Sequence, residues 1–179
     1  PLDNRRLSFN TFVFLQRIHV YKYAICNFYN NCSLWLYRME EEFKQIRSNI
    51  IKIAMYGPES TGKTTLSTQL AAHYNDGWIP EFARDFLQEK WDKNQEVCTE
   101  EDLIAIAVGQ TKIENEAVSK ANKLLFCDTN LLVTKVFSDI FYERCEPILE
   151  QAAKEHEYDL IFLTYIDVPW EADDLRDSP

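Results

Sequence analysis

The stretch GPESTGKTTL, residues 57–66, decides the fold class of this chain. It fits GxxxxGK[ST] at every fixed position, with Gly57, Gly62, Lys63 and Thr64 in the required places. The apolar run IIKIAMY precedes it, and a segment with apolar residues at helical steps follows it. The alternative is a glycine-rich turn that matches by chance. Since the flanking elements are also right, we predict a loop that holds nucleotide phosphates.

Each part of this loop has a chemical role. Glycine lets the backbone turn so that successive N–H groups point at a phosphate, and the helix that follows adds partial positive charge. We expect Lys63 to reach the β- and γ-phosphates and the Thr64 hydroxyl to ligate Mg²⁺. The predicted cofactors are therefore ATP and Mg²⁺. The predicted ATP-binding residues are Gly57, Pro58, Glu59, Ser60, Thr61, Gly62, Lys63, Thr64 and Thr65.

The rest of the chain alternates between strand and helix patterns. Short apolar runs predict strands at residues 50–56, 77–80, 124–127 and 158–165. Helical periodicity and cap signals predict helices at residues 63–74, 83–91, 99–120, 131–142 and 147–156. Strands separated by helices predict an α/β fold with a parallel sheet and helices on both of its faces.

An acidic residue follows the third predicted strand. Asp128 stands at the end of LLFCD, where ligands gather in an open α/β sheet. Phosphoryl transfer needs a carboxylate near the metal, so we expect Asp128 to bind Mg²⁺ or a metal-bound water. The structural alternative is that Asp128 or Asn130 only caps the next helix.

Three charged residues, Glu81, Arg84 and Asp85, follow the second predicted strand in the segment PEFARDF, and the first two are candidate site residues. Glu81 is well placed to take a proton from an acceptor hydroxyl or to orient it. Arg84 could bind the acceptor or a phosphate. Alternatively, the two side chains pair with each other on an exposed first turn. Lys63, Glu81 and Asp128 are the predicted catalytic residues, and Thr64 and Asp128 the predicted metal ligands.

Composition excludes several function classes. The net charge of −10 argues against a nucleic-acid partner, which calls for a basic surface. No stretch predicts a membrane span, so we expect no membrane partner. Five cysteines without paired spacing favour free thiols in a reducing compartment, and we predict a cytoplasmic protein.

The charge divides the chain at Met39. Residues 1–38 hold five basic residues and one acid, a net charge of +4, whereas residues 39–179 have a net charge of −14. We expect residues 1–38 to be a basic, aromatic extension outside the fold, and residues 39–179 to form the phosphate-binding domain. The alternative is an arm that docks on a partner.

Four blocks together resemble one family from about Asn49 onward: GPESTGKTTL, YNDGWIPEFARDFLQEKW, the strand end FCDTN and YDLIFLTYIDVPWEADDLRDSP. The chain resembles the ribosylnicotinamide kinase domain of NadR-type proteins and the small NadR-like P-loop ATPases. The resemblance implies transfer of the ATP γ-phosphate to the 5'-hydroxyl of nicotinamide riboside, which gives nicotinamide mononucleotide in NAD salvage.

The resemblance also implies aromatic side chains that stack on the nicotinamide ring. Tyr142 matches one such position. The other falls on Pro80, a departure from the family, and Trp78 lies two residues earlier on the same strand face. Trp78 and Tyr142 could equally be core aromatics. The family often has an Asp where this chain has Asn130.

Kinases of this kind close an arginine-bearing lid over the phosphates, because cations offset the charge that develops in transfer. By resemblance, Arg176 belongs to the start of such a lid and contacts the substrate. Since the sequence stops at Pro179, where lid, last strand and last helix are expected, we predict an incomplete domain of low activity.

Two other functions remain open at this point. One is phosphorylation of a different nucleoside or nucleotide on the same scaffold. The other is a regulatory ATPase without kinase activity, which calls for a water-positioning residue and an arginine from a neighbouring chain. The preferred prediction is an ATP-dependent kinase with nicotinamide riboside as its acceptor.

Overall fold

The computed structural model describes residues 39–169, and the predicted extension at 1–38 and Arg176 lie outside the described residues. The chain divides into two units, Pro1–Glu41 and Glu42–Pro179, and the second holds all the elements discussed below. In chain order these are β1 (Ile51–Tyr56), α4 (Lys63–Tyr74), β2 (Gly77–Ile79), α5 (Phe82–Asn94), α6 (Asp102–Val118), β3 (Leu124–Cys127), α7 (Leu131–Tyr142), α8 (Pro147–Glu155) and β4 (Leu160–Leu163).

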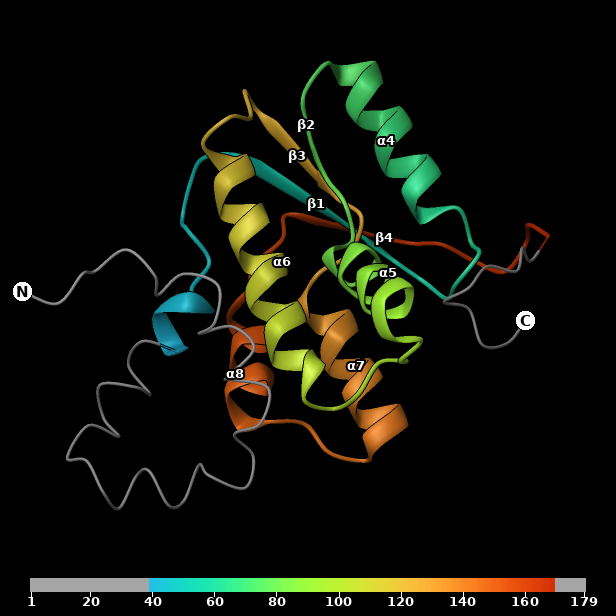
Figure 1. The fold of residues 1–179 in the computed structure, drawn as a ribbon. Helices are drawn as coiled ribbons and strands as arrows, with labels where there is room; N and C mark the ends of the chain where they lie inside the picture. The colour runs from blue at the N-terminus through green and yellow to red at the C-terminus, as the bar shows by residue number, and fades with distance from the viewer. Residues whose placement is uncertain (1–38, 170–179) are drawn as a thin grey trace, which may run out of the picture. The chain divides into compact units, whose positions relative to one another are not determined.

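The four strands form one parallel sheet in the order β2-β3-β1-β4 (Figure 1). β1 pairs directly with β3, with Ile51 opposite Leu124 and Ala54 opposite Cys127. Because all pairings are parallel, the carboxyl ends of the four strands lie on the same side of the sheet, which is called its carboxyl edge below. The predicted α/β fold with a parallel sheet is confirmed, and helix and strand bounds differ from the predicted ones by at most two or three residues.

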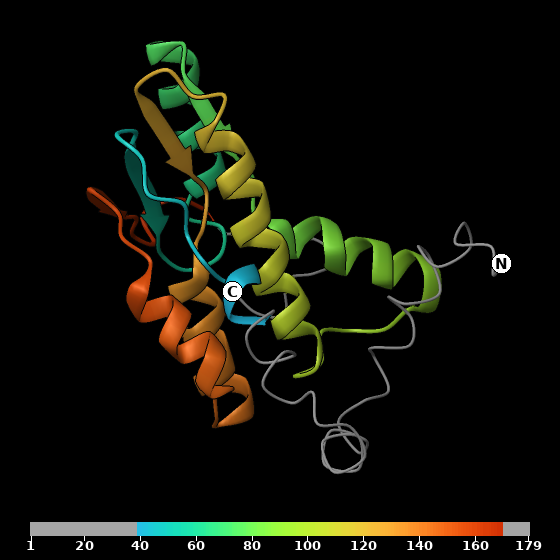
Figure 2. The same ribbon diagram turned by 90° about the vertical axis from the view of Figure 1, so that its left-hand side faces the viewer.

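Two apolar clusters cover the two faces of the sheet. On one face Met55 and Phe126 pack with Ala71 of α4. On the other face Leu125 and Cys127 pack with Val118 of α6. Successive residues of β1 and β3 point to opposite faces, so these continuous apolar strands are buried on both sides. α5 packs on α6 and extends away from the sheet (Figure 2).

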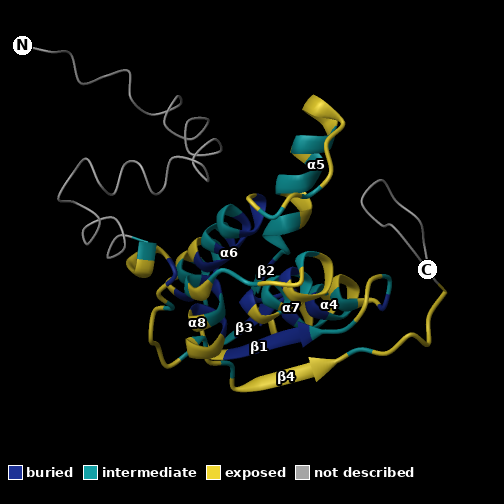
Figure 3. Ribbon diagram, turned by 90° about the horizontal axis from the view of Figure 1, so that it is seen from below, coloured by how far each residue is buried: buried dark blue, intermediate teal, exposed yellow. Residues whose placement is uncertain are grey.

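β4 forms one of the two edges of the described sheet. Leu160, Ile161, Phe162 and Leu163 are all exposed, whereas four of the six residues of the neighbouring β1 are buried (Figure 3).

Among the described residues, no helix is long and apolar enough to cross a membrane.

A buried ion pair joins β1 to α6. The ammonium of Lys52 lies 3.0 Å from a carboxylate oxygen of Glu114, and both side chains are almost fully buried. The hydroxyl of Tyr158 donates to Glu114 over 2.7 Å, and the side-chain amide of Gln45 donates over 2.6 Å. Removing Lys52 or Glu114 would leave the other charge buried and uncompensated. Because Gln45 belongs to the segment before β1 and donates to Glu114, the same network also holds that segment against α6.

His156, at the C-terminal end of α8, also contacts the segment before β1. Its Nε2 lies 2.7 Å from the carbonyl oxygen of Phe43, and its Nδ1 is buried with no hydrogen-bond partner among the described residues. Burial lowers the pKa of the His156 imidazole, and the hydrogen bond to Phe43 opposes that shift. The fold therefore accommodates the neutral ring.

We predict that this histidine makes the fold sensitive to acid. Because the folded-state pKa is lowered, the contribution of His156 to the free energy of unfolding is complete above the ordinary value of 6.5 and is lost as the pH falls below it. His156→Gln removes the titrating group and keeps a side-chain donor. In urea unfolding between about pH 8 and pH 5, the wild type should lose stability relative to the variant. Parallel pH profiles would contradict this account.

Candidate active site

The loop after β1 has the strained backbone that the sequence pattern requires. Gly57, Ser60 and Gly62 have positive φ angles of 143°, 57° and 80°. A Cβ on Gly57 would lie 2.1 Å from the hydroxyl oxygen of Thr164, so only glycine fits there. Thr61 is buried, Gly57, Ser60 and Lys63 are partly buried, and Pro58, Glu59, Gly62, Thr64 and Thr65 are exposed. The loop ends at the N-terminus of α4, which begins at Lys63.

The ammonium of Lys63 lies over the carbonyls of its own loop. It donates to the carbonyl oxygen of Gly57 over 2.9 Å and to that of Pro58 over 2.6 Å. A bound triphosphate offers oxygens with full negative charge, which are stronger acceptors than carbonyls. The lysine is thus already above the loop where phosphates would lie.

Thr64 and Asp128 meet across the direct pairing of β1 and β3. The Thr64 hydroxyl donates to Oδ2 of Asp128 over 2.7 Å. The other carboxylate oxygen, Oδ1, is buried without a hydrogen-bond partner among the described residues. Burial raises the pKa of Asp128, while the Thr64 hydrogen bond and the charges of Lys63 and Arg84 oppose the shift.

This pair fits a magnesium ion. Mg²⁺ prefers oxygen ligands and in nucleotide sites takes one or two carboxylates together with phosphate oxygens and water. Asp128 and Thr64 supply one carboxylate and one hydroxyl, and the orphaned Oδ1 is an acceptor that still needs a partner. Within residues 39–169 no group of three or more His, Cys, Asp or Glu side chains could hold a metal by itself.

Asn130, rather than Asp128, caps the helix that follows β3. The Asn130 Oδ1 accepts from the backbone N–H groups of Leu132 and Val133, and its Nδ2 donates to the Tyr56 hydroxyl over 2.7 Å. The cap therefore satisfies the N-terminus of α7 without using Asp128. Of the two sequence-based interpretations, the geometry favours the one in which Asp128 faces the loop.

Glu81 brings a second carboxylate to the same edge of the sheet. It directly precedes α5, and its side chain is partly buried. Burial raises the pKa of Glu81, Asp128 raises it further, and Lys63 lowers it. Arg84, exposed on the first turn of α5, lowers the pKa of both carboxyls. The strand ends themselves are adjacent, because Ile79 of β2 pairs with Cys127 of β3 and the Asp128 N–H donates to the Ile79 carbonyl over 3.1 Å. The segment that carries Glu81 and Arg84 therefore leaves the sheet beside Asp128, which in turn contacts Thr64.

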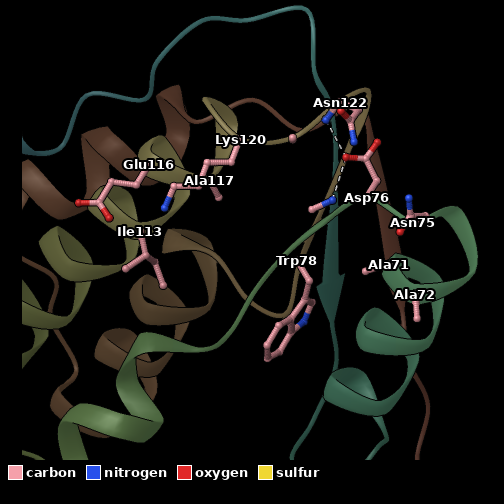
Figure 4. A pocket seen from close by; sticks show the side chains of 12 residues that line it. Ala71, Ala72, Asn75, Asp76, Trp78, Ile113, Glu116, Ala117, Lys120 and Asn122 are labelled. Carbon is pink, nitrogen blue, oxygen red and sulfur yellow. Dashed lines mark hydrogen bonds between the residues drawn. The ribbon is translucent and has the colours of Figure 1, made fainter.

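Trp78 lies elsewhere. Its indole N–H donates to the Ser67 hydroxyl over 3.0 Å, and the ring packs with the cluster between α4 and the sheet. With Ala71 and Ile113 it lines an open cavity of about 670 Å³ between α4 and α6 (Figure 4). Asp76 and Asn122 place this cavity toward the amino ends of the strands, away from the phosphate loop. The geometry favours a core role for Trp78, and stacking on a substrate stays a prediction.

Tyr142 lies at the far end of α7, about 18 Å along the helix from Asn130 at 1.5 Å per residue. Its hydroxyl donates to the carbonyl oxygen of Cys98 over 3.0 Å, and burial raises its pKa to about 12. Arg144, which follows α7, forms an ion pair with Glu100, which lies in the same α5–α6 connection as Cys98. These contacts hold the α5–α6 connection against α7, and a stacking role for Tyr142 remains a prediction.

Sequence reasoning missed Thr164, which follows β4. Its N–H and hydroxyl both bond the carbonyl oxygen of Tyr56, at 2.7 and 2.9 Å. Its hydroxyl oxygen also lies 2.7 Å from that of Thr61, which donates to the Pro58 carbonyl. Thr164 thus braces the phosphate loop from a strand more than 100 residues away, and a threonine after a strand gives no sequence signal of this.

The fold and site define the class of protein. A parallel sheet whose first strand leads through a GxxxxGK[ST] loop into a helix, with an acidic strand end beside it, is a P-loop NTPase fold. The chain belongs to the AAA domain family, whose model matches residues 52–179. Within this class it is a NadR-like P-loop domain, as the following relatives show.

Curated relatives are the trifunctional NAD biosynthesis/regulator proteins NadR of Salmonella typhimurium and Escherichia coli. Each is 32% identical over 124 residues, which cover 69% of this chain and 30% of the relative. The chain therefore spans about a third of the length of these proteins.

Solved structures agree with this placement. Crystal structures of NadR with NAD and AMP-PNP and of NadR with NR each have a TM-score of 0.57 and 25% sequence identity to this chain. The match covers 64% of this chain and 34% or 33% of the other. These likenesses support nucleotide binding, whereas the compartment of this chain remains a prediction.

We predict that Thr164 supports nucleotide affinity. Thr164→Val keeps the side-chain shape and removes the hydroxyl that contacts Tyr56 and Thr61. The Kd for MgATP, measured by calorimetry, should rise about five- to tenfold, since one or two hydrogen bonds of the loop are lost. Thr164→Ser retains the hydroxyl and should stay within about twofold of the wild type. An unaltered Kd for the valine variant would refute the bracing role.

Proposed function

We propose that this chain transfers the γ-phosphoryl group of MgATP to the 5'-hydroxyl of nicotinamide riboside. The observation that carries the proposal is that β2 and β3 end side by side, so that the segment with Glu81 leaves the sheet next to Asp128, and Asp128 contacts Thr64 of the phosphate loop. A nucleotide-binding loop alone would serve many reactions, but a second carboxylate beside it is what a kinase of small alcohols needs. The NadR structures with NR and with AMP-PNP support the choice of acceptor and donor.

In this proposal the loop and the metal ligands hold the donor. Backbone N–H groups of the loop and the α4 N-terminus surround the phosphates, and Lys63 exchanges the Gly57 and Pro58 carbonyls for phosphate oxygens. Thr64 and Asp128 hold Mg²⁺, which supplies charge neutralisation at the β- and γ-phosphates. Arg84 is proposed to bind the acceptor or a phosphate, and so is Arg176, which lies outside the described residues.

Glu81 receives the proton. The 5'-oxygen attacks the γ-phosphorus, the bond to the β–γ bridging oxygen breaks, and ADP leaves. The hydroxyl proton passes to the Glu81 carboxylate, whose raised pKa makes it a stronger base than an exposed glutamate. Catalysis rests on positioning and electrostatics, without a covalent intermediate on the protein.

A second candidate is the phosphorylation of a different nucleoside. The observation that favours it is the placement of the two aromatic side chains meant to stack on nicotinamide. Trp78 packs under α4 and Tyr142 bonds Cys98 at the far end of α7. An acceptor panel separates the two proposals, because only the acceptor pocket differs between them.

We predict that the full chain, given labelled MgATP, phosphorylates nicotinamide riboside and that Glu81→Gln lowers kcat about 100-fold or more. The loss follows from removal of the proton acceptor, so the Kd for MgATP should stay within about twofold. Glu89→Gln, the same change at an exposed position of α5, is the matched control and should leave kcat intact.

Three outcomes would count against the proposal. Phosphate transfer to thymidine or adenosine but not to nicotinamide riboside would favour the second candidate. ATP hydrolysis that no nucleoside accelerates would favour a regulatory ATPase. An unchanged kcat in Glu81→Gln would remove Glu81 from the mechanism.

A further inference from the structure

A buried glutamine of α6 grips the backbone on both sides of Glu81. The side-chain Oε1 of Gln110 accepts from the Phe82 N–H over 2.8 Å. Its Nε2 donates to the carbonyl oxygen of Pro80 over 3.3 Å. Only 1% of the Gln110 residue surface is exposed. One amide group thus fixes the chain immediately before and immediately after Glu81.

The second observation is that the Glu81 side chain does not cap the helix that it precedes. Glu81 occupies the N-cap position of α5, where a side chain normally accepts hydrogen bonds from the first N–H groups of the helix. The Glu81 side chain makes no such cap bond. Gln110 binds a different group, the N–H of Phe82 at the first helical position, and holds the backbone before Glu81 through the Pro80 carbonyl. The Glu81 carboxylate is therefore not drawn onto its own helix.

Gly109, the residue before Gln110, completes the docking. A Cβ on Gly109 would lie 2.2 Å from the ring of Phe82. The absence of a side chain lets that ring lie directly on the backbone of α6. Gln110 thus holds both residues that flank Glu81 by hydrogen bonds. Gly109 holds one of them, Phe82, by close packing.

We propose that Gln110, assisted by Gly109, is a positioning residue that keeps the Glu81 carboxylate directed at the phosphate loop. The inference rests on the proposed kinase function, in which Glu81 takes the acceptor proton. Without Gln110 the backbone on both sides of Glu81 is released, and the Glu81 side chain turns back to cap its own helix. The carboxylate then moves away from Lys63 and Asp128, whose charges act on it in the wild type.

The central experiment combines substitutions at positions 110 and 81 in the full chain. Gln110→Met keeps the length of the side chain and removes the amide. In the wild-type background it should lower kcat for nucleoside phosphorylation about tenfold or more, while the Kd for MgATP stays within about twofold. In the Glu81→Gln background it should cause no further loss, because a residue that acts through Glu81 has nothing left to position.

Two further variants separate positioning from general stability. Thr111→Val removes a buried hydroxyl that donates to Ala107 in the same helix, and it should leave kcat unchanged. Gly109→Ala displaces Phe82 by packing alone and favours the helix, so it tests the same docking if Gln110→Met fails to fold. It should lower kcat and spare MgATP binding.

The proposal is overturned if Gln110→Met lowers kcat equally in both backgrounds, or if MgATP affinity falls in parallel with kcat. Should the wild type phosphorylate no nucleoside, the proposed function fails, and the carboxyl resonance of Glu81 decides the positioning role. An NMR titration should then show a lower Glu81 pKa in Gln110→Met than in the wild type, since a carboxylate that caps a helix favours its charged form. An identical Glu81 titration in both proteins would overturn it.

Discussion

The hydrogen bond between Thr64 and Asp128 is the interaction on which the site depends. It exists because β1 and β3 are direct neighbours in register, so that the loop leaving β1 and the acid leaving β3 emerge side by side. Were another strand inserted between them, the two groups would stand about 5 Å further apart, the spacing of adjacent strands. The order of strands therefore sets the chemistry that the loop can support.

A second constraint comes from the two helices that begin next to the carboxylates of the proposed site, α5 after Glu81 and α7 shortly after Asp128. Neither carboxylate can cap its helix if it is to face the phosphate loop. Helix N-termini attract carboxylates, both by hydrogen bonds and by the helix dipole. Here amide side chains satisfy the helix ends instead, since Asn130 caps α7 and Gln110 supplies an acceptor at the start of α5. Asp128 and Glu81 can then face the phosphate loop, at the energetic cost of partial burial, which raises the pKa of both carboxyl groups.

The sequence reveals what is local and misses what depends on contacts between distant segments. The phosphate loop, the ends of α4 and α7 and the strand before Asp128 follow from patterns within a dozen residues, and the structure has them with nearly the predicted bounds. Gln110 and Thr164 gave no such signal, because their partners lie 28 and 103 or more residues away. The two-residue period of a strand places Trp78 on a face but does not reveal that α4 covers that face.

The central claim is that Thr64 and Asp128 hold the metal of MgATP, and the most direct test is the metal dependence of nucleotide binding. Calorimetry with ATP in Mg²⁺ and in excess chelator should show that the wild type binds MgATP about tenfold more tightly or better. In Asp128→Asn that preference should be lost while metal-free ATP binds as before. A wild type that ignores Mg²⁺, or a variant that keeps the full preference, would contradict the account.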